Sequence, residues 1–306
     1  MATLLDFRRR IRSVKNTQQI TRAMKFVAAA RLRRAQDKLL AARPYAQLMA
    51  RVLRSIMARI ENPQHPLLGR RPEQRVLVLV LSGDRGLCGA FNANVIRRTV
   101  QFLRERREKT LELIPIGKKG RDALRKQNWK FVAEYINVTT RVELAQAKEA
   151  AAQVIERYAA AEVDAVYLIY NEFKTVLTQK LVVEKLLPID TERRESEAAE
   201  TPMPEGSGRD DQAAGAAAAP LVDYLYEQPP AEILARLLPR YVETRVFGAM
   251  LESSAAEHAA RMTAMDSATH NAIELIDQLT LHMNKVRQAA ITKEIIEVVS
   301  GAAWSG

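Results

Sequence analysis

The chain has 306 residues, of which 47% are hydrophobic and 27% charged, and its formal net charge is +11. This composition is typical of a soluble globular or helical protein with room for one sizeable core. No apolar run reaches the ~18 residues that span a bilayer, and the single cysteine, Cys88, excludes an internal disulfide. The charge is uneven: residues 1–60 hold fifteen Lys and Arg against two Asp, whereas residues 220–306 hold seven against eleven Asp and Glu.

The N-terminal segment, residues 1–62, is predicted to be one helix. Residues 3–43 contain neither proline nor glycine, and Pro44 is followed by more helical sequence until the run NPQHP at 62–66. Apolar or small residues recur with a period of 3.6, at Met24, Ala28, Leu32, Ala35, Leu39, Ala42, Ala46, Met49, Leu53, Ile56 and Ile60. Because the two ends of the chain carry opposite charge, we expect this helix to pair with a C-terminal one.

Residues 73–190 are predicted to form an α/β domain. The run VLVLVL at 76–81 is typical of a buried strand in a parallel sheet. Strand and helix signals then alternate, which favours a doubly wound, Rossmann-like sheet. The expected strands or extended runs are 76–81, 111–116, 130–138, 165–170 and 176–186, and the expected helices are 92–107, 118–126 and 142–160.

Residues 191–219 form a compositionally separate segment. Of these 29 residues, eight are alanine, three glycine, two proline and seven acidic, and Met203 is the only other apolar side chain. So little apolar surface cannot offset the entropy of folding, so we expect a disordered, low-complexity insertion.

The last segment, residues 220–306, is predicted to be a short extended stretch followed by a long helix from Ala231, with Pro239 a possible interruption. Residues 241–300 contain no proline and one glycine. Small or apolar residues there alternate in steps of three and four, which predicts a coiled-coil seam. The seam positions are Met262, Met265, Thr269, Ala272, Ile276, Leu279, Met283, Val286 and Ala290.

Both ends of the chain resemble a known family. The runs ESSAAEHAARMTAMD at 252–266, NKVRQAAIT at 284–292 and EVVSGA at 297–302, with IRSVKNTQQITRAMK at 11–25, are similar to the terminal signatures of ATP synthase gamma subunits of bacterial type. One departure lies at 281–284, where LHMN lacks the family's usual aromatic residue before Asn-Lys. The resemblance implies a long antiparallel coiled coil of the N- and C-terminal helices plus a central Rossmann-like α/β domain.

The resemblance also implies a function and partners. The expected protein is the central rotor of an F-type ATP synthase, bound by the alpha and beta subunits as an alpha3beta3 ring, by the epsilon subunit and by the membrane c-ring. It would lie peripherally on the cytoplasmic side of the cell (inner) membrane, with no membrane span, cofactor, metal or catalytic residue of its own. Coupling contacts to the beta subunit would be made by Met24, Lys25, Arg261, Arg287, Gln288, Thr292 and Glu294. Contacts to epsilon and the membrane ring would be made by Tyr224, Tyr226 and Glu227.

Other functions were weighed against this one. The glycine-rich run at 82–92 lacks both the G-x-G-x-x-G spacing and the Lys-Ser/Thr of a phosphate loop, which favours a structural turn. The four histidines show no metal-ligand spacing, and none is near Cys88 in sequence. The basic N-terminal arm leaves open a nucleic-acid-binding protein or a basic coiled-coil adaptor, although few aromatic residues are present to stack on bases.

Overall fold

The computed structural model describes residues 3–60, 65–189 and 228–304. Two long helices, α1 (Leu4–Met57) and α6 (Pro230–Trp304), each contribute to two compact units. Unit 1 takes in Met1–Arg34, Leu87–Ala90 and Glu257–Gly306, and unit 2 takes in Ala35–Gly86 and Phe91–Ala256. The segment expected to be disordered, 191–219, lies outside the described residues, and the four-part division expected from the sequence remains a prediction.

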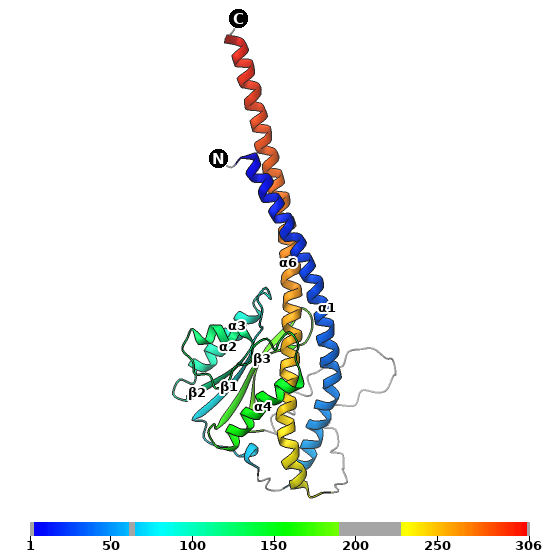
Figure 1. Cartoon of the computed structure of the whole chain (residues 1–306), viewed down its shortest axis with the longest axis vertical. Helices are drawn as coiled ribbons and strands as arrows, with labels where there is room; N and C mark the ends of the chain where they lie inside the picture. The colour runs from blue at the N-terminus through cyan, green and yellow to red at the C-terminus, as the bar shows by residue number, and fades with distance from the viewer. Residues whose placement is uncertain (1–2, 61–64, 190–227, 305–306) are drawn as a thin grey trace, which may run out of the picture. The chain divides into compact units, whose positions relative to one another are not determined.

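Unit 2 contains a four-stranded mixed sheet in the order β2-β1-β3-β4 (Figure 1). Its strands are β1 (Arg75–Leu81), β2 (Thr110–Ile116), β3 (Ala165–Phe173) and β4 (Gln179–Leu187). β1 is parallel to both β2 and β3, whereas β3 and β4 form an antiparallel pair. The predicted α/β class is therefore confirmed, and the sheet ends in a hairpin that departs from an all-parallel arrangement.

Helices follow the strands as the alternating pattern predicted. They are α2 (Phe91–Arg104), α3 (Lys118–Arg125) and α4 (Leu144–Ala159), with a short 3₁₀ turn, η1 (Pro66–Leu68), before the sheet. The extended run expected over 130–138 forms no strand of its own. It meets β2 only at two isolated bridges, Leu113 to Phe131 and Ile116 to Tyr135.

The core of unit 2 forms because β1 is apolar at every position after Arg75 and is buried throughout Val76–Leu81. Such a strand needs cover on both faces. One side of it packs with residues of α2, α3 and the neighbouring strands, in a cluster that includes Val78, Val95, Phe102 and Leu124. The same unit includes the first part of α6, residues 230–256.

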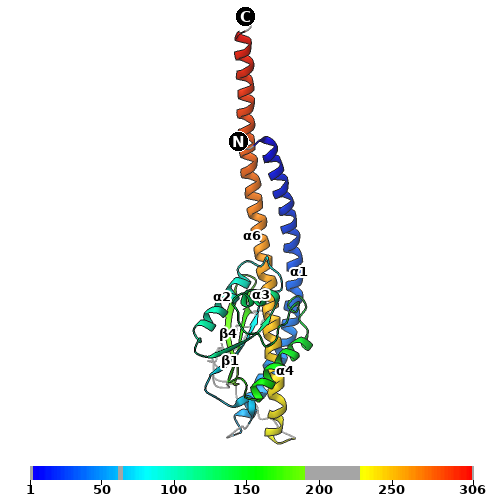
Figure 2. The same ribbon diagram turned by 60° about the vertical axis from the view of Figure 1, so that its left-hand side comes forward.

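In unit 1 the two long helices lie side by side and antiparallel, as both views show (Figures 1 and 2). Residue numbers fall on α6 as they rise on α1, which sets the direction. The contacts that define this register are Phe7 with His282, Thr21 with Thr269, and Lys25 with Asp266. The predicted pairing of the terminal helices is confirmed.

The seam positions predicted on α6 are all buried or half-buried, from Met262 to Ala290. On α1 the buried and half-buried positions 4, 7, 11, 14, 18, 21, 25, 28 and 32 follow the same alternation of three and four. That spacing keeps one face of each helix on the other, as in a coiled coil. Both helices are continuous through their internal prolines, Pro44 and Pro239, so the interruption considered at Pro239 is absent from α6.

Candidate subunit-interaction site

Lys25 and Met24 lie on α1 where it faces α6. The Lys25 Nζ is 2.6 Å from Asp266 Oδ1, and both side chains are more than a third exposed. This hydrogen bond is the main reason why the pKa of Asp266 lies below its usual range. Met24 is half-buried beside it. A partner that approaches this face therefore meets a lysine already held by a carboxylate of the neighbouring helix.

Arg261, the third residue expected to contact the beta subunit, is only 8% exposed. Its Nη2 lies 2.6 Å from Glu257 Oε1 one turn earlier on α6, and its Nη1 lies 3.3 Å from His258 Nδ1. Glu257 and His258 are buried as well. The guanidinium thus belongs to a buried polar cluster of α6, and its role toward a partner stays a prediction.

His258 is held in its neutral form within this cluster. Burial is the largest cause, and the nearby positive charges of Arg261 and Arg31 add to it, so that the pKa of His258 falls to about 4. Neutral imidazole offers Nδ1 as an acceptor if the proton is on Nε2. The short contact with the arginine requires that tautomer.

The stability of unit 1 is expected to decrease below pH 6.5 because of His258. In the unfolded chain His258 takes up a proton near pH 6.5, whereas in the folded chain it does so only near pH 4. The folded state therefore loses stability as the pH falls through this window. The loss should reach about 2 kcal/mol by pH 5. Urea unfolding at several pH values checks this, and His258→Gln should flatten the profile. Equal slopes for both proteins would contradict the assignment.

A buried hydroxyl pair joins the two helices of unit 1. The Thr269 Oγ1 lies 2.8 Å from Thr21 Oγ1 and 2.7 Å from the carbonyl oxygen of Met265, while Thr21 Oγ1 reaches the carbonyl of Gln18 at 3.0 Å. Two threonines opposite each other in a largely apolar seam favour one register of the helices.

Thr269→Val should destabilise unit 1 by about 1 kcal/mol, the usual net contribution of one hydrogen bond. Thr280→Val is the matched control, since the Thr280 hydroxyl bonds the Ile276 carbonyl of its own helix at 2.7 Å. Chemical unfolding of the three proteins gives the comparison. A cost at position 280 equal to that at 269 would show that the hydroxyl pair between helices contributes nothing.

The remaining predicted contacts lie on the last part of α6, beyond the start of α1. The register places Leu4, the first residue of α1, opposite the region of Val286. Arg287, Gln288, Thr292 and Glu294 are all exposed there. The Thr292 hydroxyl bonds the carbonyl of Gln288, one turn earlier on the same helix, at 2.9 Å.

This end of α6 also exposes a set of large apolar side chains. Their exposed fractions run from 48% to 72%, and the residues are Ile291, Ile295, Ile296, Val298 and Val299. Contiguous exposed apolar residues of this kind mark interaction surfaces. The helical periodicity continues from the seam into this end of α6, so periodicity alone could not distinguish the two. They differ because α1 begins opposite the region of Val286 and does not extend along the residues beyond it.

The sequence-predicted foot residues, Tyr224, Tyr226 and Glu227, lie outside the described residues. The residues that sequence reasoning missed are Asp266, Glu257 and Thr21. Asp266 and Glu257 flank seam positions, and their opposite sign to the basic arm was the only available signal.

The glycine-rich run at 82–92 is built around a buried carboxylate. Asp84 Oδ1 accepts from the backbone N–H groups of Lys118 and Asn137 at 2.9 and 2.8 Å, and Oδ2 accepts from Thr139 N and Oγ1. Gly120 N donates to Ser82 Oγ at 2.8 Å. The N–H groups of Lys118 and Gly120 at the start of α3 are thereby satisfied within the chain. The expected structural turn fits this geometry.

Gly117 allows the close approach on which this turn depends. It has φ of 109°, and a Cβ there would lie 2.0 Å from the carbonyl oxygen of Ser82. No side chain fits that space. Cys88, in the same run, is 2% exposed, which removes it from contact with a substrate in solution.

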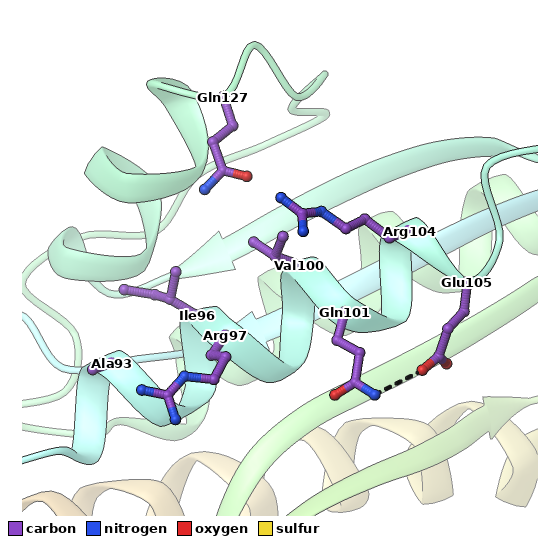
Figure 3. Close-up of a pocket in the computed structure, with 8 residues that line it drawn as sticks. All are labelled: Ala93, Ile96, Arg97, Val100, Gln101, Arg104, Glu105 and Gln127. Carbon is purple, nitrogen blue, oxygen red and sulfur yellow. Dashed lines mark hydrogen bonds between the residues drawn. The ribbon is translucent and has the colours of Figure 1, made fainter.

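A shallow groove of about 1010 Å³ lies on the outer face of α2 (Figure 3). Ala93, Ile96 and Val100 line it, and Arg97 and Arg104 flank them. The figure shows these side chains on one open helix face rather than converging on a point. Enzyme sites bring a few polar groups together in an enclosed cleft, and this groove lacks that arrangement.

Across the described ranges, no helix combines the length and apolarity needed to cross a membrane. The same residues contain no group of three or more His, Cys, Asp or Glu side chains arranged to hold a metal ion.

A long antiparallel helix pair with an exposed apolar end, combined with an α/β unit, defines a class of protein that works through contacts with other chains. A family model described as ATP synthase matches residues 3–303. The ATP synthase gamma chain of Solibacter usitatus is 50% identical over 99% of both chains, and that of Pelotomaculum thermopropionicum is 46% identical over 99% of both. The chain therefore belongs to the ATP synthase gamma chain family.

Solved structures share the fold. A chain of the Euglena gracilis mitochondrial ATP synthase, from the structure of its OSCP, F1 and c-ring in rotational state 3, has a TM-score of 0.64 at 20% identity, covering 98% of this chain and 93% of that one. A chain of the Tetrahymena thermophila mitochondrial ATP synthase central stalk and c-ring has a TM-score of 0.56 at 24% identity, covering 81% and 99%. At these identities the likeness concerns the fold.

Proposed function

We propose that this chain is the central rotor, or gamma, subunit of an F-type ATP synthase. It couples ion flow through the membrane c-ring to ATP synthesis or hydrolysis at the beta subunits by rotating within the alpha3beta3 ring. The observation that carries the proposal is the end of α6, where exposed polar and apolar side chains extend past the start of α1. Membership of the gamma chain family supports it. The fold is also shared with chains from the central stalk of one mitochondrial ATP synthase and the rotor of another.

The rotor acts by touching three equivalent catalytic pairs differently. A helix pair is asymmetric in cross-section, so each orientation presents a different set of side chains to a given beta subunit. A contact that favours the open or the closed form of that subunit changes its nucleotide affinity, and rotation passes this bias from one subunit to the next. In this mechanism the chain is non-catalytic and binds no cofactor.

The parts of the chain take distinct roles in this proposal. Residues 1–62 and 220–306 supply the shaft, in which Met24, Lys25 and Arg261 form one contact region for the beta subunit. Arg287, Gln288, Thr292 and Glu294 form a second region. Residues 73–190 supply the α/β domain, and Tyr224, Tyr226 and Glu227 supply a foot for the epsilon subunit and the c-ring.

The proposed location follows from these partners. The chain is peripheral to the cell (inner) membrane on its cytoplasmic side and is held there by the complex. Membership of the gamma chain family favours this function over the alternatives, a nucleic-acid-binding protein and a basic coiled-coil adaptor.

The test is co-expression of this chain with the alpha and beta subunits of the same cell. A complex that purifies with three alpha and three beta subunits per chain and hydrolyses ATP supports the proposal. Recovery of the chain without them, or with bound nucleic acid whose release depends on salt, would contradict it.

A further inference from the structure

A partly buried ion pair joins α6 to the sheet of unit 2, with the Arg245 side chain 35% exposed. Arg245 on α6 reaches Glu184 on β4 with its Nε at 3.2 Å and its Nη2 at 2.5 Å, one nitrogen to each carboxylate oxygen. The Tyr170 hydroxyl on β3 donates to the same carboxylate at 3.2 Å. The Glu184 side chain is 10% exposed. Arg245 is thereby committed to one carboxylate in a bidentate geometry.

A second carboxyl, that of Glu252, lies two helical turns further along the same face of α6. Its Oε2 is buried and has no hydrogen-bond partner. Buried polar atoms are almost always paired, and an ionised oxygen without a donor is the costliest exception.

Charged groups on four elements influence Glu252 electrostatically. They are Glu172 on β3, Glu184 on β4, Arg245 on α6 itself and Arg43 on α1. Burial is the largest influence and Glu172 the next, and together they outweigh the two arginines and raise the pKa of Glu252 to about 7. Tyr170, between them, stays protonated because burial raises its pKa well above the usual range.

We propose that Glu252 is a proton-sensitive contact between α6 and the β3–β4 edge of the sheet. In the neutral form its carboxyl packs without charge against the sheet. In the ionised form an unpaired negative charge is added to those of Glu172 and Glu184, and the contact between α6 and the sheet opens more readily. This goes beyond the proposed rotor function, since it concerns how firmly α6 is held by the domain at different pH.

The direction of the effect follows from linkage. When the segment is unfolded or locally open, Glu252 binds a proton only at a pH near or below the ordinary pKa of glutamate. When the contact between α6 and the sheet is closed, Glu252 binds the proton up to about pH 7. The contact between α6 and the sheet is therefore most stable at low pH and loses stability as the pH rises through neutrality. This is opposite in sign to the effect of His258 in unit 1.

The experiment is amide hydrogen exchange of the full chain between pH 5.5 and 8.5, corrected for intrinsic exchange, read in peptides from 241–256 and 165–187. We expect protection there to fall by at least about tenfold as the pH rises, one pKa unit being tenfold in an equilibrium. Glu252→Gln keeps the size of the side chain but cannot ionise, so it should abolish that fall in protection. Glu232→Gln, at an exposed position in the first turn of α6, should leave it unchanged.

A second variant keeps the proposal testable if Glu252→Gln folds poorly. Glu172→Gln removes the largest repelling charge, so the midpoint of the wild-type transition should move to lower pH by several tenths of a unit. A pH dependence of protection that is the same in wild type and Glu252→Gln, or a midpoint unmoved by Glu172→Gln, would overturn the proposal.

Discussion

Replacing Arg287 and Gln288 together with alanine is expected to lower ATP turnover by the assembled complex at least about tenfold, with the chain still folded and assembled. Both side chains are exposed, and neither contributes to the seam with α1. A guanidinium there can bind a carboxylate or backbone carbonyls in a bidentate geometry that lysine cannot reproduce. Each charge-assisted bond contributes about 1.5–3 kcal/mol, which corresponds to one to two orders of magnitude in an equilibrium.

The matched control is Arg236→Ala, which removes an exposed arginine from α6 at a position in unit 2. It should leave turnover at the wild-type rate. Circular dichroism and recovery of the intact complex establish that both variants fold and assemble. Unchanged synthesis and hydrolysis in the double variant would mean that the two residues are passive surface and that the predicted beta-subunit contact is misplaced.

Arg261→Met is expected to destabilise unit 1 by about 3–5 kcal/mol. The substitution keeps an apolar side chain of similar length but leaves the carboxylate of Glu257, whose side chain is 4% exposed, without its arginine. Loss of one member of a buried ion pair costs this much because the other charge stays buried. Denaturant unfolding followed by helical circular dichroism measures the change.

Two comparisons separate this effect from a general loss of charge. Glu257→Gln combined with Arg261→Met should recover most of the stability, since no charge is then stranded. Lys25→Met should cost much less than Arg261→Met, because the Lys25–Asp266 pair is partly open to solvent. If Arg261→Met proved no less stable than Lys25→Met, the interpretation that Arg261 neutralises the buried Glu257 carboxylate would be wrong.

The sequence specified the seam of α6 because a repeat of three and four has one structural solution, a helix packed on another helix. The same holds for β1, whose unbroken apolar run requires burial on both faces. The antiparallel hairpin of β3 and β4 did not follow from the pattern, since alternation of strand and helix says nothing of the direction of the last strand. The extended run at 130–138 was read from composition, and two bridges to β2 are all that it forms.

The candidate site was only partly accessible to sequence reasoning. The resemblance implies beta-subunit contacts at Arg287 and Gln288, and both side chains are exposed, as such contacts require. Arg261 looked equally available, but its burial depends on Glu257 and His258 closing around it, which only three-dimensional packing reveals. The pairing of Lys25 with Asp266 depends on the register between residues 241 positions apart, which no local pattern encodes.

The central claim, that this chain rotates within a ring of catalytic subunits, is tested by watching a probe attached to it. Leu177 lies in the turn between β3 and β4 and is 85% exposed, whereas the natural Cys88 is buried, so Leu177→Cys provides a single reactive thiol. With the alpha and beta subunits fixed to a surface, the account predicts that ATP drives the probe in one direction in three steps per turn. Steady ATP hydrolysis while the probe stays still would contradict it.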